Sequence, residues 1–170
     1  MSDTKQMSLF GGGPKEKKAS AHWKLFFDGA SRNNPGPAGV GIYLTKEGEP
    51  VVHRGFFVGI KTNNQAEYLA LLLGLFFVKQ QADAQDLIQI LSDSQLLVRQ
   101  LEGKYRVKSE HLQPMHRAAL AIMRELNYDI AHILREGNTH ADKMANVGID
   151  KKNPLPNDFV SFLEEHNISC

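Results

Sequence analysis

The stretch KLFFDGASRNNPGPAGVGIYLTKEGEPVVHRGFFV, residues 24–58, decides the fold of this 170-residue chain. Three apolar runs lie within it, at residues 24–30, 40–45 and 51–58, and segments rich in glycine, asparagine and proline separate them. Short apolar runs bounded by such turn residues are typical of β-strands, and brief connections favour antiparallel pairing. We therefore predict three sequential antiparallel strands.

Beyond residue 61 the pattern changes to alternating helices and strands. The polar opening Thr62–Glu67, with Thr62 or Asn63 as the candidate N-cap, precedes an apolar helix that we expect to reach about Lys79. Three strands followed by this alternation indicate the α/β class, with a mixed sheet and helices on both faces. We further expect strands at residues 87–91 and 128–134 and helices at residues 94–101, 112–126 and 138–147, the last of them capped by Asn138.

Length and composition indicate one compact domain with tails. Hydrophobic residues make up 42% of the chain, which is enough for one ordinary core. We expect residues 1–21 to form a flexible tail, residues 22–150 the domain, and residues 151–170 a C-terminal extension with a short helix. The formal net charge is only +1, so any binding of nucleic acid would depend on local patches and bound cations.

Cysteine usage and apolar runs bear on where the protein works. The single cysteine, Cys170, leaves no internal disulfide framework and fits a reducing compartment. The N-terminus lacks the order of a signal peptide, and the longest apolar run, Tyr68–Val78, is too short to cross a bilayer. We expect a soluble, cytoplasmic and monomeric protein with no membrane partner.

Four carboxylates occupy positions from which they can meet at one edge of the sheet. Asp28 and Asp93 each end a short apolar strand, and a right-handed crossover can place the first and fourth strands side by side. Glu67 and Asp142 lie near the starts of two helices, so each can point toward the same strand ends. Oxygen-only ligands suit Mg²⁺ or Mn²⁺, which promote displacement at a phosphodiester. Taken alone, each acid has an ordinary alternative as a turn residue, a helix cap or a surface charge.

The residues around these four acids resemble the type 1 ribonuclease H family over roughly residues 23–149. Each acid lies in its own motif, and the motifs follow in the family's order: DGAS and NPGPAG within residues 28–39, TNNQAE at 62–67, SDSQ at 92–95, and REGNTHAD and AN within 135–146. The resemblance implies a five-stranded mixed sheet of order 3-2-1-4-5. It also implies endonucleolytic hydrolysis of the RNA strand of RNA/DNA hybrids, without sequence preference.

The same resemblance implies roles for individual residues. Hydrogen bonds to the 2′-hydroxyl distinguish RNA from DNA, whereas phosphate contacts set the register. The catalytic residues and ligands of two Mg²⁺ ions, for which Mn²⁺ is a possible substitute, would be Asp28, Glu67, Asp93 and Asp142. The positions that match contacts with the hybrid are Gly29, Ser31, Asn34, Asn64 and Gln95 near the cut, and Thr62 and Asn63 at a phosphate of the DNA strand.

Two departures from well-studied bacterial members point to a compact branch of the family. Residues 100–108 pass directly into the next helix and leave no room for a basic, tryptophan-bearing protrusion. Residues 134–137 are too short for the mobile histidine loop, so we expect neither His132 nor His140 to be essential. Two interpretations stay open for the basic residues before the helix, contact with phosphate or a solvated turn; these residues are Lys104, Arg106 and Lys108.

The N-terminal segment Gln6-Met7-Ser8-Leu9-Phe10 resembles the short peptide by which bacterial replication and repair proteins dock on the sliding clamp. Leu9 and Phe10 would be the apolar anchors, Gln6 a polar orienting contact, and residues 11–14 a linker. The alternatives are a chance match of five residues, or packing of Leu9 and Phe10 on the domain.

Two other functions are compatible with the fold. A hybrid-binding module that has lost turnover is one, although the complete set of four acids argues against it. Another nuclease of the same fold, such as a resolvase or a strand-transfer domain, is the other, and the motifs that match hydroxyl contacts argue against that one.

Overall fold

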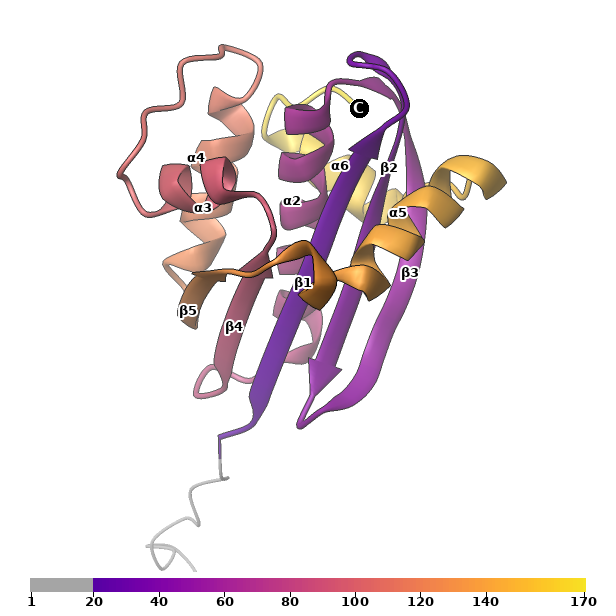
Figure 1. The fold of residues 1–170 in the computed structure, drawn as a ribbon. Helices are drawn as coiled ribbons and strands as arrows, with labels where there is room; N and C mark the ends of the chain where they lie inside the picture. Colours follow the sequence, from indigo (N-terminus) through magenta and orange to yellow (C-terminus); the bar gives the residue numbers. More distant parts are fainter. Residues whose placement is uncertain (1–19) are drawn as a thin grey trace, which may run out of the picture.

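The computed structural model describes residues 20–170, which form a five-stranded mixed sheet with helices on both faces (Figure 1). Residues 1–19, including the predicted clamp peptide, lie outside the described part of the chain. In chain order the elements are β1 (His22–Ser31), β2 (Gly36–Lys46), β3 (Glu49–Lys61), α2 (Asn63–Gln81), β4 (Leu87–Ser92), α3 (Gln95–Leu101), α4 (Gln113–Met123), β5 (Asn127–His132), the 3₁₀ turn η1 (Arg135–Gly137), α5 (Thr139–Lys151) and α6 (Asn157–Glu165).

The strand order β3-β2-β1-β4-β5 confirms the predicted topology. β1, β2 and β3 are antiparallel neighbours, and β4 pairs in parallel with β1 and with β5. Phe26 of β1 is the partner of Leu91 in β4, and Asp28 and Asp93 each come two residues later. The crossover therefore brings the carboxyl ends of the first and fourth strands together, as the apolar pattern predicted.

Helix α2 begins at a capping box and runs through the core. Thr62 is the N-cap: its side chain accepts a hydrogen bond from Gln65 N at 3.2 Å, and the Gln65 side chain accepts one from Thr62 N at 2.9 Å. Such a cap satisfies two backbone donors that the first helical turn leaves free. Because α2 lies between the sheet and α4, residues around most of its circumference are buried, which explains its nearly continuous apolar sequence.

The C-terminal extension contributes to the same core. α6 buries Phe159 and Leu163 completely, and the Phe159 ring meets the edge of Phe76 from α2 with 5.4 Å between the ring centroids. Burying a large apolar side chain contributes about 1.5–3 kcal/mol. The segment after residue 151 therefore packs on the domain core and stabilises the fold.

Helix α5 lies on the opposite face of the sheet, directly against the strand backbone. A Cβ atom on Gly41 of β2 would lie 1.9 Å from the carbonyl oxygen of Ala141, so no other residue fits there without moving the helix. Gly41 is also the β-ladder partner of Asp28. This close approach therefore places the first turn of α5, which carries Asp142, next to the end of β1.

Several predicted boundaries were wrong by a few residues. β5 ends at His132 rather than Leu134, because the chain leaves the sheet for η1 and Leu134 is 72% exposed. α4 ends at Met123 rather than residue 126, and α5 continues to Lys151 rather than residue 147. Among residues 20–170, no helix combines the length and the apolar character needed to cross a membrane.

Candidate active site

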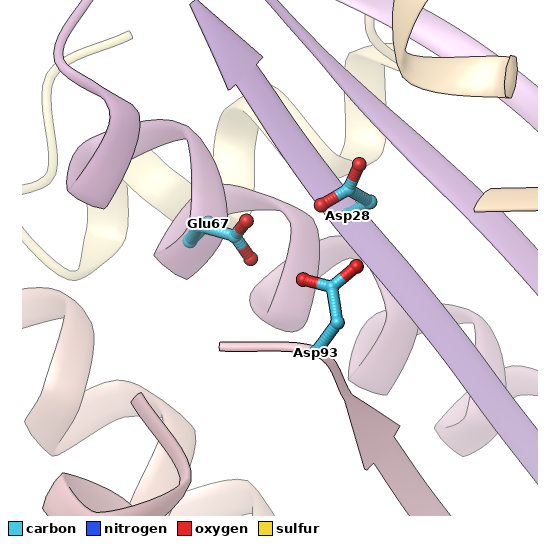
Figure 2. A group of neighbouring side chains, drawn as sticks. All are labelled: Asp28, Glu67 and Asp93. Carbon is cyan, nitrogen blue, oxygen red and sulfur yellow. The ribbon is translucent and has the colours of Figure 1, made fainter. Parts of the chain in front are cut away.

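Three of the four predicted carboxylates converge at the carboxyl end of β1 and β4. Asp28, Glu67 and Asp93 each offer an oxygen, and these oxygens lie within 4.8 Å of one another. Figure 2 shows the three side chains pointing toward one another from β1, from α2 and from the turn after β4. The crossover topology and the position of α2 over the sheet thus create the cluster from residues far apart in sequence.

Asp142 lies at the wall of the same cavity but outside this close group of three. It is in the first turn of α5 and near enough to act on the pKa of Asp28. The cavity has a volume of about 480 Å³ and opens to solvent. Its lining consists of Asp28, Gly29, Ala30, Ser31, Asn63, Asn64, Glu67, Asp93, Ser94, Arg135, Thr139 and Asp142.

The proximity of these acids is electrostatically unfavourable without a cation. Burial raises the pKa of Asp28 to about 7; the charges of Asp93 and Asp142 also raise it, and a hydrogen bond with Glu67 lowers it. Burial likewise raises the pKa of Glu67 well above its usual range, and the charge of Asp28 adds to the effect. Buried like charges raise one another's pKa in this way because ionising the second group costs Coulomb energy.

The donor set fits a hard divalent cation. The Glu67 Oε2 atom is buried and has no hydrogen-bond partner within residues 20–170, although a buried carboxylate oxygen normally has one. No lysine or arginine in the described part of the chain forms an ion pair with any of the four acids. Clustered, unpaired carboxylate oxygens are the ligands that Mg²⁺ and Mn²⁺ prefer.

Asn138 is the N-cap residue of α5, as predicted, but its side chain does not cap the helix. Its Nδ2 atom donates instead to Phe27 O at 3.0 Å and to Asp93 Oδ2 at 3.1 Å. N-cap statistics describe local geometry, and they carry no information about acceptors brought from distant strands.

The structure places four of the seven predicted substrate-contact residues at the cavity. Gly29, Ser31, Asn63 and Asn64 line it, whereas Asn34, Thr62 and Gln95 lie outside the lining. Asn34 and Gln95 are exposed to solvent. Thr62 forms the capping box of α2.

Hydrogen bonds tie the loop after β1 to the start of α2. Asn63 Oδ1 accepts from Ser31 N at 3.1 Å, and Asn63 N donates to Asn34 Oδ1 at 3.0 Å. The Ser31 hydroxyl donates to Lys61 O at 2.8 Å. These predicted contact residues are therefore held in fixed positions relative to one another.

Gly29 also has a structural reason to be glycine. A Cβ atom there would lie 2.3 Å from Glu67 N and 2.2 Å from the carbonyl carbon of Ala66. The close approach lets α2 bring Glu67 to the end of β1. Packing of the helix accounts for this residue independently of any contact with a substrate.

Sequence reasoning missed three polar residues in the lining. Ser94, Arg135 and Thr139 share the cavity with the acids. All three lie within or directly beside the motifs around Asp93 and Asp142, and adjacency to those motifs was the available signal.

Neither histidine of the predicted pair lies in the lining of the cavity. His132 Nε2 lies 3.2 Å from Asp93 O, and because a carbonyl oxygen only accepts, the ring nitrogen is the donor. His140 stacks on Tyr43 with ring centroids 4.3 Å apart. That neither is essential stays a prediction.

A second groove of about 540 Å³ adjoins the acid cavity through Asn64, which lines both. The side chains that line it are both basic and apolar, and Tyr105 within it is half exposed. The basic residues Lys104, Arg106 and Lys108 therefore line a groove that lies beside the site.

Known proteins that resemble this chain in sequence include ribonucleases H. The family described as "Reverse transcriptase-like" matches residues 26–148. "Ribonuclease HI" of Halobacterium salinarum is 38% identical over 128 residues, which cover 74% of this chain. The chain spans 63% of the length of that relative.

Solved structures give the same result. The crystal structure of RNase H1 from H. salinarum superposes with a TM-score of 0.71 at 36% identity, covering 78% of this chain and 99% of that one. LC11-RNase H1, solved in complex with an RNA/DNA hybrid, superposes with a TM-score of 0.68 at 34% identity, covering 78% of this chain and 98% of that one.

Proposed function

Because this chain belongs to the type 1 ribonuclease H family, we propose that it hydrolyses the RNA strand of RNA/DNA hybrids endonucleolytically and without sequence preference. The observation that carries the proposal is the cluster of Asp28, Glu67 and Asp93, with oxygens within 4.8 Å of one another and a buried Glu67 oxygen without a partner. The hybrid bound to the related LC11 enzyme supports the choice of substrate.

In this proposal Asp28, Glu67, Asp93 and Asp142 hold two Mg²⁺ ions when substrate is bound, and Mn²⁺ can replace them. When bound, these ions would supply activation of a water and charge stabilisation at the scissile phosphate. The chain's own contribution is the placement of the acids: β1 carries Asp28 three residues before its end, the turn after β4 carries Asp93, and α2 and α5 bring one acid each. Burial raises the pKa of both Asp28 and Glu67, so a bound cation would displace their protons and take the carboxylates as ligands.

The polar residues beside the acids would hold the hybrid. Gly29, Ser31, Asn63 and Asn64 line the cavity, where backbone and side-chain groups can reach the sugar and phosphate nearest the cut. We assign Asn34, Thr62 and Gln95 to the same surface as further contacts. Contacts with the 2′-hydroxyl supply the selectivity for RNA.

The basic groove would receive the uncut strand. Lys104, Arg106 and Lys108 line it beside Asn64, which supports phosphate contact over a solvated turn. Replacing all three by alanine is expected to reduce the salt dependence of hybrid binding, because a variant with fewer phosphate contacts releases fewer counterions from the hybrid when it binds. An unchanged slope of affinity against salt concentration would favour the solvated turn.

Hydrolysis assays on matched duplexes test the proposed activity. Labelled RNA/DNA, DNA/DNA and RNA/RNA duplexes are incubated with Mg²⁺, with Mn²⁺ and with EDTA. We expect cleavage of the RNA strand of the hybrid only, and none in EDTA. Binding without cleavage would indicate a hybrid-binding module, and equal cutting of DNA/DNA would indicate another nuclease of this fold.

We also propose that Gln6, Leu9 and Phe10 dock the enzyme on a bacterial sliding clamp. Support comes from the sequence alone, because the peptide lies outside the described residues. Titration of a purified clamp with the intact protein and with Leu9→Ala/Phe10→Ala tests it. Micromolar-range binding that the double variant loses is expected, and equal binding by both would contradict it. Monomeric state and cytoplasmic location stay predictions.

A further inference from the structure

The side-chain amide of Asn138 lies at the junction of three segments that carry acids. The residue is 1% exposed, and its Nδ2 atom donates to Phe27 O at 3.0 Å and to Asp93 Oδ2 at 3.1 Å. Both partners can only accept, so the nitrogen and not the oxygen of the amide must face them. The orientation of this side chain is therefore fixed by its hydrogen bonds.

Three hydrogen bonds of Asn138 act on or beside a proposed ligand. Phe27 immediately precedes Asp28 in β1, and Asp93 is bonded directly. The Asn138 backbone carbonyl accepts from Asp142 N at 3.1 Å, the first helical bond of α5. A single residue thus links the end of β1, the turn after β4 and the first turn of α5.

The position of Asn138 is unfavourable for a residue with only a local structural role. An asparagine at an N-cap normally bonds to free N–H groups of its own helix, and this one does not. Its Oδ1 atom is buried without a partner in the described chain, which carries a desolvation cost. These two costs are explained if the amide donor is needed at the acids.

We propose that Asn138 is a positioning residue that holds the Asp93 carboxylate in its ligand orientation and anchors it to β1. The inference rests on the proposed function, since it assigns the residue to the same site. Without the amide, Asp93 would lose its donor and turn away from Asp28, whose charge repels it. Loss of a residue that orients a metal ligand in this way typically weakens metal binding by about 10- to 100-fold.

Mn²⁺ titration calorimetry on the substrate-free protein, together with kcat and KM for the hybrid, tests the inference. Asn138→Ala is expected to weaken Mn²⁺ binding and lower kcat at least about tenfold, with KM nearly unchanged. Asn138→Asp is expected to lower both further, because its carboxylate would face two acceptors. The matched control is Asn153→Ala, which removes an amide that donates to Gly55 O at 3.2 Å. This control is expected to lower Tm but leave Mn²⁺ affinity within about twofold.

Equal Mn²⁺ affinity of the wild type and Asn138→Ala overturns the inference, whatever the activity. If Asn138→Ala fails to fold, Asn138→Ser is measured instead. Its hydroxyl is one bond closer to the backbone and has a single proton, so it cannot replace both hydrogen bonds of the amide. Mn²⁺ binding weakened at least about tenfold in Asn138→Ser supports the inference, and wild-type affinity in that variant overturns it. Failure of the proposed function is distinguishable, since a wild type that binds Mn²⁺ without cutting any hybrid leaves the affinity comparison intact.

Discussion

Asp28→Asn is expected to stabilise the metal-free protein above neutral pH, although it removes a residue of the proposed site. Burial, with the charges of Asp93 and Asp142, raises the pKa of Asp28 from 3.8 to about 7. The Asp28 carboxyl therefore loses its proton at a lower pH in the unfolded chain than in the folded chain. Between the two pKa values, folding is accompanied by uptake of a proton. Stability falls as pH rises through this window, and the penalty is complete above about pH 7. At about 1.4 kcal/mol per pKa unit, the penalty reaches about 4 kcal/mol.

An asparagine at position 28 has no charge to bury, so most of this penalty should disappear. We expect a gain of about 2–4 kcal/mol in the free energy of unfolding near pH 8 in EDTA, or about 5–15 °C in Tm for a chain of this size. Near pH 4 most of the gain should be lost, since Asp28 is protonated in the folded state and partly protonated in the unfolded chain there. Urea unfolding at both pH values measures the difference directly.

Asp86→Asn is the matched control, with the opposite sign. Asp86 is also buried, but it accepts hydrogen bonds at 2.9 Å from Ala21 N, Asp83 N and Trp23 Nε1. Burial raises the pKa of Asp86, yet these bonds outweigh burial and hold it below its usual value. Its contribution to stability is present at neutral pH and is lost as pH falls. A loss of stability in Asp28→Asn near pH 8, or an equal gain at both pH values, would refute the reasoning.

Four further outcomes follow from the site and the packing. Asp93→Asn should lower hybrid cleavage more than about 100-fold, because a ligand charge is lost, with the fold and hybrid affinity kept; a hundredth or more of wild-type turnover in saturating Mg²⁺ would exclude the role. Gly41→Ala should cost at least about 2 kcal/mol of unfolding free energy, since its Cβ would overlap α5, and urea unfolding within about 0.5 kcal/mol of wild type would contradict the contact. Thr62→Ala should cost about 1 kcal/mol through the lost cap, measured in the same way, with Thr62→Ser retaining most of it. His132→Ala and His140→Ala should each keep kcat within about tenfold, and a larger loss would indicate general acid–base catalysis.

Local sequence patterns predicted the helices and strands because the spacing of apolar residues and the turn residues that bound each element lie close together in the sequence. The short apolar runs of β1 and β4 and the rule of right-handed crossover were sufficient to predict that Asp28 and Asp93 meet. Thr62 was predictable as a cap because its partner Gln65 lies three residues away. The main helices and the adjacency of the first and fourth strands follow from such short-range information, whereas the full strand order was implied by the family resemblance.

Features that depend on long-range contacts could not be predicted in the same way. The partners of Asn138 lie 45 and 111 residues away, so the sequence around it indicated only a cap. The contact between Phe159 and Phe76 likewise joins the extension to a helix that ends far earlier in the chain. The motif around Asp142 predicted that this acid lies at the site, but no local pattern could place it outside the closest group of three acids.

The close packing of α5 on Gly41 also limits which substitutions this protein can accept. Any substitution of that glycine introduces a Cβ atom where the carbonyl oxygen of Ala141 now lies, so no neutral first step leads away from it. A lineage that altered the spacing between Asp142 and Asp28 would have to shift the helix first, through several compensating changes at once.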